Sequence, residues 1–129
     1  MVNLLIVAHS AQLAAGVKEF VEEVTRGAVR VAAVGGAADG SLGTDVDRVR
    51  ASLREIQTPD GVLVLVDFNS AVMSVEVALE ESGGLPVVIS DAPLVEGAYM
   101  AAVEASVGAT LEETAAAALR AREMVKVHR

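Results

Sequence analysis

The chain opens with an almost unbroken apolar run over residues 2–8, which stops abruptly at His9. Apolar side chains on both faces of a strand are typical of a parallel sheet that helices cover on both sides. In such a sheet, ligands and reactive groups gather at the carboxyl ends of the strands. The run therefore predicts a buried first strand that places His9 at the ligand-binding edge of the sheet.

Short apolar runs alternate with helical periodicity along the remaining chain, which is the pattern of an α/β fold with a parallel sheet. We expect a three-layer, doubly wound, mostly parallel sheet with strand order 2-1-3-4 and helices on both faces. A length of 129 residues favours one domain spanning 1–129. Beyond the first strand, strands are expected at 29–34, 62–66 and 86–90, and helices at 13–24, 44–56, 70–82, 94–107 and 110–126.

Hydroxyl side chains stand where three of these helices are expected to begin. Thr44 and Ser70 are predicted N-caps of the second and third helices, because their side chains can accept a hydrogen bond from the first turn. Thr110 and Glu113 have the spacing of a capping box for the last helix. The buried stripe of the first helix is predicted to consist of Leu13, Val17, Phe20, Val21 and Val24.

The composition excludes several classes of function. Lys and Arg total 10 against 18 Asp and Glu, so the chain lacks the basic surface that nucleic acid requires. Aromatic residues make up 2%, which leaves little to stack on bases or flavins. No apolar run is long enough to span a bilayer, and there is no cysteine, so we expect a cytoplasmic protein without membrane contact.

The expected strand order places a crevice between the first and third strands, where His9 and Asp67 follow the strand ends. A carboxylate that accepts a hydrogen bond from one imidazole nitrogen leaves the other nitrogen free as a nucleophile. The helix expected to begin at Ser70 adds an N-terminus that favours anions. These groups are what a phosphohistidine carrier needs, and they require no metal. Only His9 is well placed as a metal ligand, so no metal site is expected.

Four separated motifs then carry a family resemblance over nearly the whole chain. They read VNLLIVAHS, GGAADGSLGTD, DGVLVLVDFNSAVMSVEVALE and APLVEGAYMAAVEASVGA. Together they resemble the DhaM family, the phosphoryl-donor subunits of phosphoenolpyruvate-dependent dihydroxyacetone kinases and relatives of the mannose-type enzyme IIA. The resemblance implies that His9 is phosphorylated, that Asp67 orients it, and that Ser70 faces the phosphoryl group.

The same resemblance implies the partners. HPr would donate a phosphoryl group derived from phosphoenolpyruvate, ADP bound to the DhaL subunit would accept it, and DhaK would bind dihydroxyacetone. No bound cofactor is expected. The family is usually homodimeric, and the helix at 94–107, which is rich in small side chains, is our candidate for part of that contact.

Two features depart from the family pattern. Asn69 stands where glycine is expected, which restricts the backbone but adds an amide donor. Some family members carry appended HPr-like and enzyme I-like domains, whereas this sequence ends at Arg129, so we expect a separate HPr to serve it.

Around the catalytic pair, phosphate-positioning roles are expected for Ser10, Gly43, Thr44, Asn69, Ser70 and Ala71.

Several alternatives remain. A mannose-type enzyme IIA that feeds a sugar permease shares the roles of His9 and Asp67, so those residues do not separate it from a dihydroxyacetone kinase subunit. A non-catalytic binding module predicts no phosphoryl group on His9. The glycine-rich loop at 35–43 matches neither a Walker A loop nor G-x-G-x-x-G, and it is either a surface loop or a lid. A serine hydrolase is disfavoured because G-x-S-x-G is absent.

Overall fold

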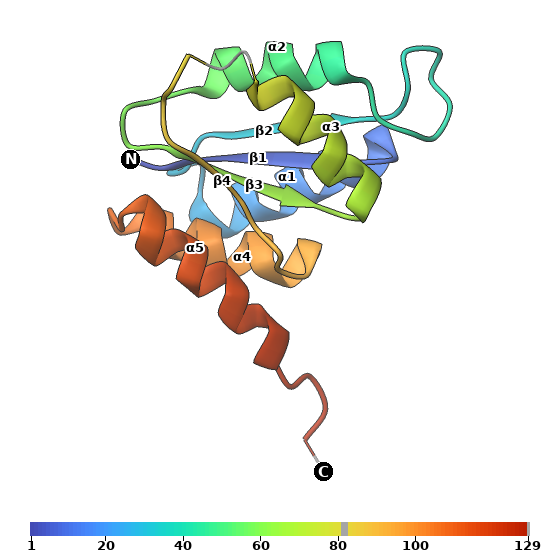
Figure 1. Ribbon diagram of the computed structural model, residues 1–129. Coiled ribbons are helices and arrows are strands. Elements are labelled where there is room, and N and C mark those ends of the chain that lie inside the picture. The colour runs from blue at the N-terminus through green and yellow to red at the C-terminus, as the bar shows by residue number, and fades with distance from the viewer. Residues whose placement is uncertain (81–82, 129) are drawn as a thin grey trace.

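Within residues 1–80 and 83–128, which the computed structural model describes, four strands form a sheet between two layers of helices (Figure 1). The chain alternates strand and helix up to the fourth strand and then adds further helices. In order, the elements are β1 (Asn3–Ala8), α1 (Ala11–Thr25), β2 (Val31–Gly35), α2 (Val46–Ile56), β3 (Val62–Val66), α3 (Asn69–Leu79), β4 (Val87–Ile89), α4 (Leu94–Ser106), α5 (Leu111–Arg120) and a 3₁₀ turn, η1 (Ala121–Glu123).

The sheet has the order β2-β1-β3-β4, and every strand pair in it is parallel. Leu4 of β1 lies opposite Val31 of β2 on one side and Leu63 of β3 on the other. The predicted α/β class, the three layers and the strand order are therefore confirmed. Because β1 and β3 are central neighbours whose connections leave toward opposite faces of the sheet, their carboxyl ends border the crevice expected at this point.

Each face of the sheet has its own apolar core. Leu4 and Ile6 point toward the layer of α1, α4 and α5, whereas Leu5 and Val7 point toward the layer of α2 and α3. All four side chains are fully buried. Burying a Leu or Ile side chain stabilises the fold by roughly 1.5–3 kcal/mol, so the opening run holds both layers together.

Element ends differ from the sequence-based expectation in a few places. β2 begins at Val31 rather than at residue 29, and the last α-helix ends at Arg120 rather than near Lys126. Met124, which follows η1, has an extended backbone, and the β-branched valines at 125 and 127 weaken helix formation in the chain beyond it. β4 is confined to Val87–Ile89, and the predicted end of the third helix at Ser82 lies outside the described residues.

Two predicted helix caps are wrong. Asp45, not Thr44, caps α2, and its side chain accepts a hydrogen bond from the N–H of Asp47. The N-cap of α3 is Phe68 rather than Ser70, and α3 has no side-chain cap at all. The physical reason is that the Thr44 hydroxyl and the Ser70 hydroxyl are used in contacts between segments, which the local sequence does not reveal. The capping box of Thr110 and Glu113 is confirmed.

The small side chains of α4 pack inside the chain. They are buried against the sheet and the neighbouring helices, so a contact of this helix with a second copy would use its exposed residues, and that contact stays a prediction. Because these residues are small, the backbone of α4 can lie close to the sheet and bury its apolar face. These residues are Gly97, Ala98, Ala101, Ala102 and Ala105.

A surface that we call the α1–α4 face consists instead of four exposed apolar residues: Leu13, Phe20, Val95 and Tyr99. The rings of Phe20 and Tyr99 stack with their centroids 6.1 Å apart. The predicted stripe of α1 is thus only partly core, because Val17 and Val21 are buried while Leu13 and Phe20 face outward.

Among the described residues, no helix has the length and apolar character needed to cross a bilayer.

Candidate functional site

His9 and Asp67 come together as predicted, because each follows the end of one of two paired central strands. The carboxylate of Asp67 accepts two hydrogen bonds from His9, one from its backbone N–H at 2.8 Å and one from the ring Nδ1 at 2.9 Å. The side chains are 25% and 8% exposed, respectively. This geometry places the ring proton on Nδ1 and leaves the lone pair of Nε2 available.

The pKa of Asp67 lies below its ordinary value of 3.8. Burial acts in the opposite direction and raises the pKa of this carboxyl, but the hydrogen bonds and the charge of His9 outweigh it. The backbone N–H of Phe68 adds a further hydrogen bond, 2.8 Å from Oδ1. The carboxylate is therefore ionised at neutral pH and holds the imidazole in one orientation and one tautomer.

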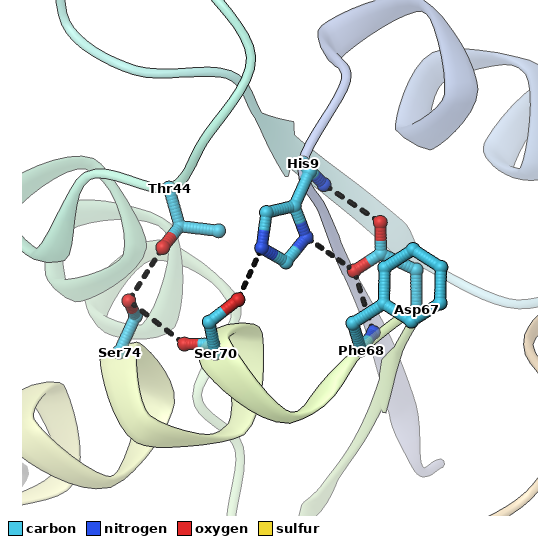
Figure 2. A network of polar contacts seen from close by, with 6 residues as sticks. All are labelled: His9, Thr44, Asp67, Phe68, Ser70 and Ser74. Carbon is cyan, nitrogen blue, oxygen red and sulfur yellow. Dashed lines mark hydrogen bonds and ion pairs between the residues drawn. The ribbon is translucent and has the colours of Figure 1, made fainter.

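The other ring nitrogen of His9 faces the first turn of α3. Nε2 is hydrogen-bonded to the hydroxyl of Ser70 (Figure 2). Because Nδ1 carries the proton, the Ser70 hydroxyl donates to Nε2. Ser10, Asp45 and Thr110 cap α1, α2 and α5 with their side chains, whereas α3 and α4 begin without such a cap. The first N–H groups of α3 thus remain suited to an anion beside Nε2.

The β2–α2 loop (residues 36–45) reaches the same site. The N–H of Gly43 donates to the carbonyl of His9 over 2.8 Å, and Gly43 has φ 143°, a conformation that favours glycine. The hydroxyl of the next residue, Thr44, lies 2.6 Å from the hydroxyl of Ser74 on α3. Ser74 is absent from the sequence-based site, although its position four residues after Ser70 on one helix is a signal that could have found it.

The remaining predicted phosphate-positioning residues have varied surroundings. The hydroxyl of Ser10 accepts a hydrogen bond from the N–H of Leu13 and so caps α1. Ala71 has a buried side chain, and its N–H donates to the carbonyl of Phe68. Asn69 is exposed and lines a cavity of about 460 Å³ on the far side of Asp67, toward the ion pair of Asp91 and Arg122. Their roles at a phosphoryl group stay predictions.

The arrangement supports nucleophilic chemistry at Nε2. An oriented imidazole with one lone pair can attack an electrophilic phosphorus, and the uncapped start of α3 with Ser70 can stabilise the oxygens of the transferred group. Positioning and charge stabilisation are the main requirements of phosphoryl transfer. Across the described part of the chain, no group of three or more His, Cys, Asp or Glu side chains could hold a metal ion.

Comparison with known families gives an independent view. The model of the EIIA-man family, described as the phosphotransferase-system fructose IIA component, matches residues 3–115. A crystal structure of a protein of unknown function is 33% identical, with a TM-score of 0.79 over 92% of this chain and 93% of that one. A sigma-54 interaction domain protein from Enterococcus faecalis, 18% identical with a TM-score of 0.68, shares the fold.

Curated relatives carry more specific names. The phosphotransferase subunit DhaM of a dihydroxyacetone kinase in Lactococcus lactis is 35% identical over 85% of this chain and 87% of that protein. The phosphoryl donor subunit DhaM of a second such kinase, in Listeria innocua, is 33% identical over 87% and 92%. For the DhaM of Escherichia coli, 36% identity extends over 95% of this chain but only 27% of the relative.

Proposed function

The chain belongs to the EIIA-man family of phosphotransferase-system components, and we propose that it carries a phosphoryl group on His9 for a dihydroxyacetone kinase. The observation that carries the proposal is the pairing of Asp67 with Nδ1 while Nε2 faces Ser70 at the uncapped start of α3. The names of the DhaM relatives support the choice of kinase. In this role the protein is the phosphotransferase component that holds a phosphohistidine intermediate.

In the accepting step, the lone pair of His9 Nε2 attacks the phosphorus of a phosphohistidine on the donor, for which we propose HPr. The bond from phosphorus to the donor nitrogen breaks as the bond to Nε2 forms, and its electron pair returns to the donor imidazole. The proton on Nδ1 stays hydrogen-bonded to Asp67, which offsets the positive charge that develops on the ring. Ser70 releases Nε2 and donates its hydroxyl to a phosphoryl oxygen.

In the donating step, a terminal phosphate oxygen of ADP attacks the same phosphorus. The bond to Nε2 breaks, the electron pair returns to the imidazole, and ATP forms on the acceptor. We propose that this ADP is bound to a DhaL subunit and that the ATP serves DhaK, which holds dihydroxyacetone. We propose that this exchange takes place in the cytoplasm. A sugar permease is the alternative acceptor, because the matching family model is described as a fructose IIA component.

The surroundings of His9 suit a protein partner. Three large apolar side chains on the segments that border the site are strongly exposed: Leu42 at 79%, Phe68 at 71% and Met73 at 65%. The ring of Phe68 contacts that of His9 edge-on, with centroids 5.8 Å apart. Exposed apolar side chains around a reactive group are typical of protein docking surfaces. They favour delivery of the phosphoryl group by a protein over delivery by a small molecule.

We also propose that the chain forms a homodimer through the α1–α4 face. Two of the three aromatic residues of the chain, Phe20 and Tyr99, lie exposed on this face. Exposed aromatic side chains are enriched where protein surfaces bury one another. The face comes from α1 and α4, on the opposite side of the sheet from α3, so such a dimer leaves His9 open to its partners.

Labelling tests the carrier function directly. Protein incubated with phosphoenolpyruvate, enzyme I and HPr is expected to gain one phosphoryl group by intact mass, and His9→Ala is expected to gain none. The other histidine supplies the control, because His128 is exposed near the end of the chain. His128→Ala is expected to be labelled like the parent. Equal labelling of His9→Ala would show that the phosphoryl group is not carried on His9.

The acceptor is identified by adding ADP-loaded DhaL to the labelled protein. Loss of the phosphoryl group from His9 with the appearance of ATP on DhaL is the expected result. Retention of the label in the presence of DhaL, with loss on addition of a sugar-permease component, assigns the chain to sugar transport instead.

A further inference from the structure

The hydrogen bond between Thr44 and Ser74 has no part in the chemistry described above, although it ends one helical turn from Ser70. It joins two segments that are 30 residues apart, the β2–α2 loop and α3, and both groups are half-buried. Figure 2 shows both hydroxyls on the Nε2 side of the imidazole, with Asp67 on the other side. A hydrogen bond at 2.6 Å between two such groups holds the loop and the helix together.

The direction of this hydrogen-bonded chain follows from counting protons. Ser74 donates its single hydroxyl proton to the carbonyl of Ser70, 3.3 Å away. Its oxygen then accepts, so Thr44 is the donor in the bond between the two hydroxyls. The chain of hydrogen bonds runs from Thr44 to Ser74 and on to the carbonyl of Ser70. It therefore ends on the residue whose side chain is hydrogen-bonded to Nε2.

Gly43 and Thr44 connect the two halves of the site. The N–H of Gly43 holds the backbone of His9, at the end of β1, while the side chain of Thr44 holds α3, at the end of β3. Two consecutive loop residues thus span the crevice between the carrier histidine and the helix that faces it. The separation of Nε2 from the first turn of α3 depends on this link as well as on the sheet.

We propose that Thr44 and Ser74 are a positioning pair that holds the first turn of α3 against a phosphoryl group on His9. The proposal rests on the carrier function proposed above. With the pair intact, Ser70 and the start of α3 stay close to the phosphoryl oxygens, which favours transfer to the acceptor and limits access of water. The oxygen of a water molecule that reaches phosphorus forms a bond to it as the bond to Nε2 breaks. The electron pair returns to the imidazole, and inorganic phosphate and the proton of the water are released.

The test compares Ser74→Ala and Thr44→Val with matched substitutions away from the site. Ser106 donates to the carbonyl of Val103 and Thr25 donates to the carbonyl of Val21, so Ser106→Ala and Thr25→Val remove similar helical hydroxyls. Each protein is labelled on His9 and separated from the donor. The release of inorganic phosphate and the transfer to ADP on DhaL are then timed.

We expect each variant of the pair to release phosphate about 3- to 10-fold faster than the parent and to transfer to ADP slower by a similar factor. The double variant should be no worse than Ser74→Ala, because both single variants remove the bond between Thr44 and Ser74, and Ser74→Ala already removes the bond to the Ser70 carbonyl as well. Thr44→Ser keeps the hydroxyl and should restore parental rates. Ser106→Ala and Thr25→Val should behave like the parent.

The outcomes distinguish a failure of the positioning pair from a failure of the carrier function on which it rests. A parent protein that takes no label on His9 contradicts the carrier function itself. If the parent is labelled but Ser74→Ala matches Ser106→Ala in phosphate release and in transfer to ADP, the positioning pair alone is contradicted. If Ser74→Ala does not fold, the Thr44 variants test the proposal in its place. A Thr44→Ser protein that is as impaired as Thr44→Val would show that the hydroxyl of residue 44 does not have the proposed positioning role.

Discussion

At the scale of single residues, one carboxylate determines what His9 can do. Asp67 accepts from both the backbone N–H and the ring Nδ1 of the same histidine, so it fixes the position and the tautomer together. An imidazole held only at its ring could rotate or carry its proton on Nε2, and the nucleophilic lone pair would then point away from an incoming phosphoryl group.

Substituting Asp67 by asparagine tests the tautomer argument. The amide can donate to Nδ1 and thereby favour the proton on Nε2, so Asp67→Asn is expected to slow labelling of His9 by at least about tenfold. The rate of mass gain with a fixed amount of phospho-HPr measures the effect. Asp60→Asn, at an exposed aspartate on the surface, is the control. An Asp67→Asn protein labelled as fast as this control would contradict the orienting role.

The lowered pKa of Asp67 predicts how stability depends on pH. Because the folded-state pKa lies below the ordinary 3.8, the ionised carboxylate stabilises the fold fully above pH 3.8. This stabilisation is lost as the pH falls through the folded-state pKa. Titration of the carboxyl carbon by NMR should give a midpoint below 3.8, and a midpoint at or above 3.8 would show that burial outweighs the hydrogen bonds.

At the scale of elements, α3 gives up a favourable cap at the site. The first turns of α1, α2 and α5 are capped by side chains. At the site, α3 follows Phe68, whose ring cannot accept a hydrogen bond, and α4, away from the site, follows Pro93 and also lacks a side-chain cap. Leaving a helix without a cap costs stability but keeps its N-terminal N–H groups for a ligand. We interpret this as a local exchange of stability for phosphoryl binding.

Introducing a cap should reverse that exchange. Phe68→Ser is expected to stabilise the protein by about 0.5–1 kcal/mol relative to Phe68→Ala, because the serine hydroxyl can accept from the first turn of α3. The same hydroxyl competes with the phosphoryl oxygens, so labelled Phe68→Ser should lose its phosphoryl group to water faster than labelled Phe68→Ala. Urea denaturation and phosphate release measure the two effects. A serine variant that is both more stable and slower to release phosphate would contradict this interpretation.

At the scale of the whole molecule, the two faces of the sheet have different tasks. The layer of α2 and α3 borders His9, and the layer of α1, α4 and α5 presents the α1–α4 face. Because the residues of β1 and β3 between them are buried, the sheet separates the carrier site from the proposed dimer contact.

A charge on the α1–α4 face tests the proposed dimer. Tyr99→Glu places a carboxylate where Phe20 stacks, so it is expected to convert a dimer to a monomer without preventing labelling of His9. Light scattering during gel filtration gives the mass. Leu42→Glu is the control for the mass measurement, because Leu42 is also apolar and exposed, at 79% against 36% for Tyr99, but lies in the β2–α2 loop. A parent that elutes as a monomer at all concentrations would end the proposal of a dimer.

Apolar patterning was sufficient to predict the class, and the commonest order of four parallel strands added to it predicted the meeting of His9 with Asp67. These features depend on which residues are buried and on the handedness of short connections, and local patterns in the sequence are enough to predict both. The residues that follow two central strands must then lie near each other, whatever the details of the loops.

The contacts between segments required the tertiary structure. Thr44 and Ser70 read as helix caps, because a hydroxyl before a helical stretch has that local role. In the folded chain, Thr44 bonds to Ser74 and Ser70 bonds to His9, partners that are 30 and 61 residues away. The small side chains of α4 likewise could not be assigned to a core or to a surface until packing placed them. Periodicity identifies the face of an element, and only packing decides what that face meets.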